Sequence, residues 1–108
     1  MALVINEVLL FGRLVKDPQP VGESTLARLC VLEERDGHQF RTFIPLEAWG
    51  KAAQDLRRLQ EGADVYLRGK LKWRSAERDG QKTGELVVLV WQLQLARHAA
   101  EDATARMN

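Results

Sequence analysis

The chain has 108 residues, of which 45% are hydrophobic and 29% are charged, a balance that predicts one soluble globular domain with a modest core. Sixteen Lys plus Arg against fifteen Asp plus Glu leave a formal net charge of +1. This total excludes a protein that binds through bulk positive charge, but it leaves room for a local basic surface.

The cysteine count and the length of the apolar runs exclude several further classes of protein. The single cysteine, Cys30, excludes an internal disulfide and a zinc site built on several thiolates. The longest apolar run, residues 86–91, is too short to span a bilayer, and no basic segment followed by a long apolar stretch marks a signal peptide. We therefore expect no membrane association and a reduced, cytoplasmic location.

In chain order, the pattern predicts short strands around one helix. Aliphatic and β-branched runs predict five strands, over residues 3–14, 25–33, 40–49, 63–75 and 85–95. Residues 50–62 have helical spacing of apolar side chains, and Gly62 is placed to end that helix. Gly12, inside the first strand, predicts a bulge or a sharp bend.

Three strands, a helix and two strands are the order of one known all-β architecture. It is the five-stranded Greek-key barrel of the OB-fold, with its helix between strands three and four. Asp36-Gly37 and Asp79-Gly80 are typical two-residue hairpin turns that fit this fold. We expect a single domain over residues 1–97, followed by a short flexible tail over residues 98–108.

The fourth predicted strand carries a row of basic side chains. By strand alternation, one face holds Val65, Leu67, Gly69, Leu71 and Trp73, and the other holds Tyr66, Arg68, Lys70, Lys72 and Arg74. The cations repeat at about 6.5–7 Å, close to the phosphate spacing of an extended single strand. Residues 68–82 hold six basic and two acidic side chains, so they carry +4 and the rest of the chain carries −3. The alternative is a solvated face, although a row of like charges repels itself unless an anion offsets it.

Two aromatic residues share one face of the third predicted strand. Phe43 and Trp49 stand where a solvent-facing position is normally polar. Exposed rings beside a row of cations are the two parts of a single-strand groove, because bases stack on rings while cations contact phosphates. The alternative is that the two rings cap the core or fill a subunit interface.

The remaining chemistry-bearing residues predict no catalytic or metal site. Trp73 and Trp91 are expected in the core or an interface, Cys30 as a buried thiol, and His38 and His98 in solvent. The pair Glu33-Glu34 is expected on a solvated hairpin shoulder. Phosphate-loop and nucleophile-elbow motifs are missing, so we expect a binding module without cofactor rather than an enzyme.

Several segments resemble the bacterial single-stranded DNA-binding protein family. The similar segments are residues 6–18, 43–53, 62–72 and 79–88. The resemblance extends over residues 4–95 and implies an OB-fold that binds single-stranded DNA as a homo-oligomer, a dimer or a tetramer. It also implies roles for individual residues. Phe43 and Trp49 fall on stacking aromatics, Lys51 on a basic residue beside the helix, and Lys72 and Arg74 on arginines that contact phosphates.

The chain also departs from that family's pattern. The hairpin over residues 33–40 is short and lacks a stacking tryptophan unless Phe40 replaces it, Ala76 stands near an expected aromatic, and Pro45 replaces an arginine. The sequence stops at Asn108 without an acidic, apolar tip, so we expect no recruitment of repair enzymes by that route. A reduced member is favoured: one similar to primosomal replication protein N, or a short phage, plasmid or paralogous protein.

The sequence thus predicts a non-enzymatic protein of replication, repair or recombination that binds single-stranded DNA with little dependence on base sequence. The candidate binding residues are Phe43, Trp49, Lys51, Arg68, Lys70, Lys72 and Arg74. Two alternatives are an OB-fold module that binds a protein partner and an OB domain that binds RNA.

Overall fold

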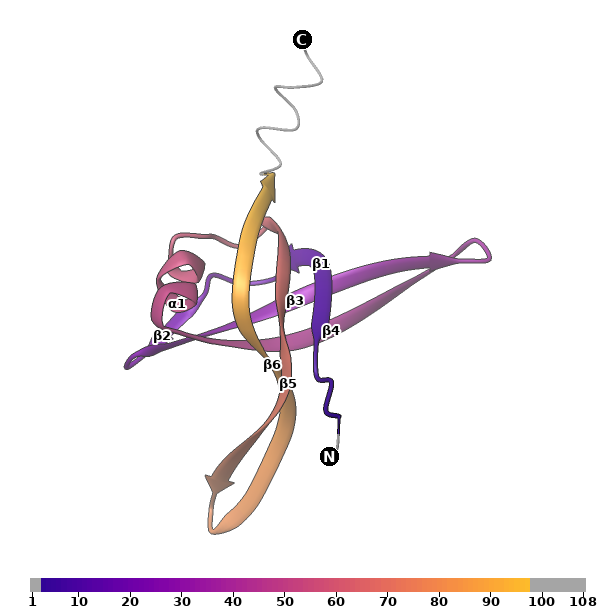
Figure 1. Cartoon of the computed structure of the whole chain (residues 1–108). Coiled ribbons are helices and arrows are strands. Elements are labelled where there is room, and N and C mark those ends of the chain that lie inside the picture. The colour runs from indigo at the N-terminus through magenta and orange to yellow at the C-terminus, as the bar shows by residue number, and fades with distance from the viewer. Residues whose placement is uncertain (1–2, 98–108) are drawn as a thin grey trace.

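The computed structural model describes residues 3–97, which form six strands and one helix (Figure 1). The elements are β1 (Val8–Leu14), β2 (Gln19–Val21), β3 (Ser24–Arg35), β4 (His38–Trp49), α1 (Gly50–Arg57), β5 (Asp64–Arg78) and β6 (Gln81–Arg97). The predicted order of three strands, a helix and two strands is confirmed, with β2 as a short addition. Because Gly22 adopts a positive φ of 62°, the chain turns back after Val21 and β2 pairs with the start of β3.

The sheet closes on itself as a five-stranded barrel. Its strand order is β1-β5-β6-β4-β3-β2, and a further pairing joins β1 to β3. β1 runs antiparallel to β5 from Val8 to Arg13 and meets β3 at Arg13 and Leu14. Within residues 3–97, the pairing of β4 with β6 is the one parallel pairing. This closed arrangement with one helix is the predicted OB-fold.

Gly12 lies where β1 passes from β5 to β3. A side chain there would come within 2.5 Å of the Cys30 carbonyl oxygen and 2.8 Å of the Leu29 side chain, so only hydrogen fits. The ladder between β1 and β5 runs through Gly12 without a shift, and the predicted bulge is therefore absent from this position. The register shifts lie between β5 and β6, where Trp91 and Ala96 are extra residues on β6.

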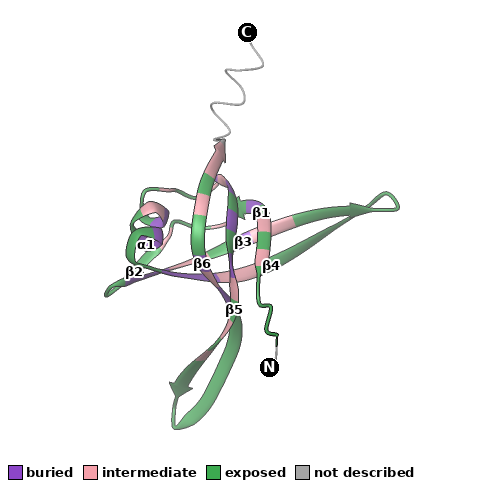
Figure 2. Ribbon diagram, viewed as in Figure 1, coloured by how far each residue is buried: buried purple, intermediate pink, exposed green. Residues whose placement is uncertain are grey.

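Two hairpins extend from the barrel as arms (Figures 1 and 2). Both predicted turns are confirmed: Asp36 and Gly37 have φ of 53° and 78°, and Asp79 and Gly80 have φ of 54° and 76°, the conformation of a type I′ turn. Every residue over 32–43 and over 75–86 is exposed. We call these segments the β3–β4 arm and the β5–β6 arm.

The core lies inside the barrel, and α1 closes one end of it. Its buried side chains include Leu14, Leu29, Leu46, Leu56, Val65 and Val90. α1 contributes Ala53 and Leu56 and ends at Arg57, earlier than predicted. Gly62, with φ of 92°, lies in the turn after the helix, and its N–H donates to the Leu14 carbonyl at 2.8 Å.

Candidate nucleic-acid interface

Three neighbouring strands place most of the predicted binding residues on one outward face. Glu47 on β4 is opposite Leu89 on β6, and Leu89 is opposite Lys70 on β5. Residues opposite each other in a ladder point to the same side, so the outward residues of β4 share a surface with the basic residues of β5. We call this surface the basic–aromatic face; it consists of Phe43, Pro45, Glu47, Trp49, Lys70, Lys72 and Arg74.

The two aromatic residues of this face are open to solvent. Phe43 and Trp49 are each 49% exposed. The alternate positions on β4 behave differently, because Leu46 and Ala48 are buried in the core and Ile44 packs against it. The rings therefore remain available to a ligand, although their burial on the inside would have been worth more to the fold.

Sequence reasoning missed one cation that adjoins these rings. Arg28 on β3 is paired with Pro45, and its guanidinium carbon lies 5.7 Å from the centroid of the Phe43 ring, a cation–π distance. The signal was present, because counting outward from the Asp36-Gly37 turn pairs residue 28 with residue 45. Arg28 thus supplies a positive charge beside Pro45, where the sequence comparison had indicated a lost arginine.

Most cations of the predicted basic row are paired with carboxylates. Arg68 Nε lies 2.5 Å from Glu7 Oε1, and Lys72 Nζ lies 2.7 Å from Glu47 Oε2. Arg74 pairs with Glu85 across the β5–β6 ladder. Lys70 has no ion pair among residues 3–97. The row therefore presents less net charge to solvent than its sequence suggests.

The pair of Lys72 with Glu47 differs from the other two in its burial. The Glu47 side chain is only 7% exposed, against 52% for Glu85, and the Lys72 side chain is 38% exposed. Val87, the partner of Lys72 in the ladder, is also buried, so the lysine stem covers apolar surface while its ammonium reaches Glu47. Glu47 was not a candidate, because its partner comes from a strand that is distant in sequence.

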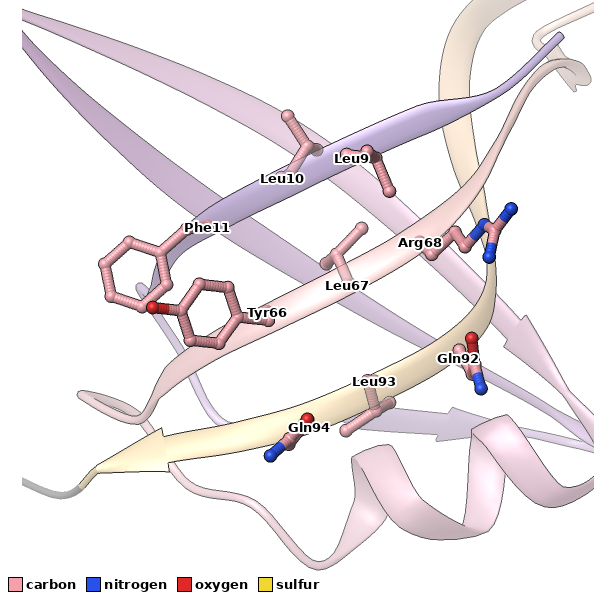
Figure 3. A pocket seen from close by; sticks show the side chains of 9 residues that line it. All are labelled: Leu9, Leu10, Phe11, Tyr66, Leu67, Arg68, Gln92, Leu93 and Gln94. Atoms are coloured by element: carbon pink, nitrogen blue, oxygen red, sulfur yellow. The ribbon is translucent and has the colours of Figure 1, made fainter.

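Arg68 lies on a different surface from the other basic residues of β5. It is opposite Leu9 on β1 and Gln92 on β6, beyond the register shift that follows Arg68. Its neighbours line an open cleft of about 500 Å³ (Figure 3). We call the outward side chains there the β1–β5–β6 patch: Leu9, Phe11, Tyr66, Arg68, Gln92 and Gln94. The Phe11 and Tyr66 rings pack with centroids 4.5 Å apart.

The other residues singled out from the sequence lie as follows. Lys51 is exposed in the first turn of α1. Trp73 and Trp91 are 60% and 51% exposed, so neither packs in the core. Cys30 is half-buried on the outward face opposite Phe43, so the prediction of a buried thiol is wrong. Its position on β3 alternates with Leu29, which takes the inward place.

The polar candidates lie away from any cluster. His38, Glu33 and Glu34 are exposed on the β3–β4 arm, whereas His98 lies outside the described residues. In the described chain, no three His, Cys, Asp or Glu side chains gather as a metal-binding group. No helix there has the length and apolar character needed to cross a membrane.

Comparison with known proteins gives one family and several relatives. Residues 5–96 match the model of the single-strand binding protein family. Single-stranded DNA-binding protein 1 of Streptococcus pyogenes is 31% identical over 95% of this chain and 86% of its own length. The single-stranded DNA-binding protein of Clostridium tetani is 33% identical over 72% of this chain and 61% of its own.

A solved structure shows the same fold. It is described as the Plasmodium falciparum SSB complex with ssDNA, and it superposes with a TM-score of 0.74 over 90% of this chain and 99% of that one. Its sequence identity to this chain is 18%. The barrel is therefore shared while most side chains differ.

Proposed function

As this chain belongs to the single-strand binding protein family, we propose that it binds single-stranded DNA along the basic–aromatic face. It is a binding protein and not an enzyme. The observation that carries the assignment of this face is its composition. Exposed Phe43 and Trp49 on β4 lie on the same side of the sheet as Lys70, Lys72 and Arg74 on β5, although about 20 or more residues separate the two groups in the sequence.

In this proposal, the rings and cations have separate tasks. Bases stack on Phe43 and Trp49, each stacked base contributing about 1–3 kcal/mol. Arg28 supports the Phe43 ring, and Lys51, Lys70 and Arg74 contact phosphates. Arg68, also a predicted binding residue, lies on the β1–β5–β6 patch and is left out of this path. Neither stacking nor phosphate contact reads base edges, so binding depends little on base sequence.

A salt-dependent titration with oligo-dT tests the proposed function. Binding should quench tryptophan fluorescence, weaken with a slope of about −0.7 per contacted phosphate in a plot of log K against log salt, and be stronger than binding of duplex. Lys70→Gln should reduce the steepness of that slope by about 0.7, whereas Lys16→Gln, on the loop after β1, should leave it unchanged. A flat titration of the unaltered protein at low salt would contradict the proposal.

We further propose that the chain works as a homo-oligomer through the β1–β5–β6 patch. Leu9, Phe11 and Tyr66 expose apolar surface there, on strands whose inward faces already fill the core. Light scattering should give a dimer or a larger assembly, and Tyr66→Glu should lower the mass. Phe40→Glu, an equally exposed aromatic on the β3–β4 arm, should not. A monomeric mass for the unaltered protein would refute this assignment.

The remaining assignments are also proposals. Residues 1–97 are the binding domain, in a cytoplasmic protein of DNA replication, repair or recombination. Residues 98–108 are proposed as a tail and lie outside the described residues. Competition between DNA and RNA oligomers of the same length tests the choice of nucleic acid, and an equal affinity for RNA would overturn it.

A further inference from the structure

We propose that Glu47 restrains nucleic-acid binding by holding the ammonium of Lys72 in a closed ion pair, so that Lys72 adds little to the attraction of phosphates. This inference rests on the proposed function, because it concerns the same basic–aromatic face. It assigns Glu47 as a positioning residue that acts through Lys72, and it predicts that removing the glutamate charge tightens binding.

The first support is the place of Glu47 in the sheet. It occupies the outward row of β4 between Phe43 and Trp49, the two proposed stacking residues. Its neighbours across the sheet are Leu26 on β3 and Leu89 on β6. A negative charge thus lies among the rings at which a polyanion would bind, where it opposes the ligand.

The second support is the burial of the carboxylate. Its side chain is 7% exposed, and in the described chain its hydrogen-bond partner is the ammonium of Lys72, at 2.7 Å. A buried carboxylate loses its partner only at the cost of an uncompensated charge, so the pair stays closed when a phosphate approaches. By contrast, the exposed carboxylates of Glu7 and Glu85 can turn into water and release Arg68 and Arg74.

The third support is the electrostatic consequence for counterions. A lysine without an ion pair on a binding face attracts counterions, which are released when a phosphate binds. This release sets the salt dependence of affinity. An ammonium that is neutralised at 2.7 Å gathers fewer anions. Lys72 therefore contributes its stem and its N–H groups to the face but little net charge.

Glu47→Gln tests the inference because it removes the charge and retains an oxygen that accepts from Lys72. We expect oligo-dT to bind about two- to fivefold more tightly at low salt, with the slope of log K against log salt steeper by about 0.7. Glu23→Gln is the matched control, since it makes the same change of net charge at an exposed position in the turn between β2 and β3. That control should leave the slope unchanged.

A second substitution separates a specific release of Lys72 from a general change. In the Glu47→Gln protein, adding Lys72→Met should return the affinity and the slope to those of the unaltered protein. The inference is overturned if Glu47→Gln leaves the slope unchanged, or if the gain survives Lys72→Met. Loss of the proposed function has a different signature, because the unaltered protein would then give no binding in the same titration.

Discussion

The Phe43 ring lies near a cation and is also partly open to solvent. Arg28 lies 5.7 Å from the ring centroid, while about half of the Phe43 surface stays open. We expect Phe43→Ala to weaken oligo-dT binding by about 1–3 kcal/mol and to leave the salt slope unchanged, because stacking releases no counterions. Polarisation of a labelled oligonucleotide measures both quantities.

The control for this variant is Phe40→Ala, which removes an equally exposed ring from the β3–β4 arm. By strand alternation the Phe40 ring lies on the opposite side of β4 from Phe43, so it does not replace the missing stacking tryptophan, and Phe40→Ala should bind almost as the unaltered protein does. Equal losses in the two variants would mean that Phe43 is not a specific stacking position.

Lys72 and Lys70 differ in what their removal leaves behind. Lys72→Ala leaves the buried carboxylate of Glu47 without its partner, so we expect the free energy of unfolding to fall by about 1–3 kcal/mol. Lys70→Ala breaks no ion pair among residues 3–97 and should cost less than about 0.5 kcal/mol. Urea unfolding at one protein concentration gives both values.

This difference between Lys72 and Lys70 also decides which lysine should be replaced in DNA-binding experiments. Lys72→Glu would place a second carboxylate against the buried carboxylate of Glu47, so a loss of DNA binding would include a loss of fold. Lys70 is the cleaner position for testing phosphate contact. If Lys70→Ala and Lys72→Ala lower stability equally, Glu47 does not depend on Lys72.

At the scale of the element, β6 approaches β5 so closely at Gly69 that no side chain fits there. A side chain at Gly69 would lie 2.0 Å from the Leu89 carbonyl oxygen and 2.9 Å from the Leu89 carbonyl carbon, both backbone atoms. The register shift that makes Trp91 an extra residue lies at this point. We expect Gly69→Ala to lower the free energy of unfolding by about 2–4 kcal/mol, measured by chemical denaturation.

The matched control is Gly80→Asn at the tip of the β5–β6 arm. Gly80 has a positive φ of 76°, and an added Cβ there would meet no atom within 4 Å; asparagine tolerates that conformation better than other residues with a side chain. This variant should lose less than about 1 kcal/mol. A similar loss in both variants would contradict the role given to the close approach of β6.

The elements that could be predicted are those with local signals. The Asp-Gly turns set the register of β3 with β4, and that of β5 with β6 as far as Gly69, and alternation predicted that Phe43 and Trp49 would be outward. The β5 partners of residues on β6 were harder to predict. A single extra residue such as Trp91 shifts the register, so every residue beyond it has a different partner.

The environment of Glu47 could not be predicted for a similar reason. Its burial depends on the parallel pairing of β4 with β6, two strands that are far apart in the sequence. The exposure of Leu71 and Trp73 could not be predicted for a similar reason. Alternation predicts that both side chains face inward, but it does not show that they lie beyond the end of the barrel. Local sequence patterns predict which side chains share one face of a strand. The closure of the barrel decides which of those side chains are buried.

At the scale of the whole molecule, stability should be distributed unevenly between barrel and arms. The arms are two-stranded and exposed over residues 32–43 and 75–86, whereas Leu46, Val88 and Val90 lie in the closed core. Amide hydrogen exchange should be at least about a hundredfold faster in the arms than at these three core positions. Uniform exchange across the chain would contradict this division.

The closure of the barrel by β1 has a consequence for the order in which the chain can fold during synthesis. β1 leaves the ribosome first, yet its longest ladder is with β5, where Val8 pairs with Gly69. Until β5 and then β6 have been made, β4 and β1 each keep an unpaired edge and the core remains open. A chain synthesised only as far as β5 would therefore have an open sheet, so completion of the β5–β6 hairpin protects the nascent chain from aggregation.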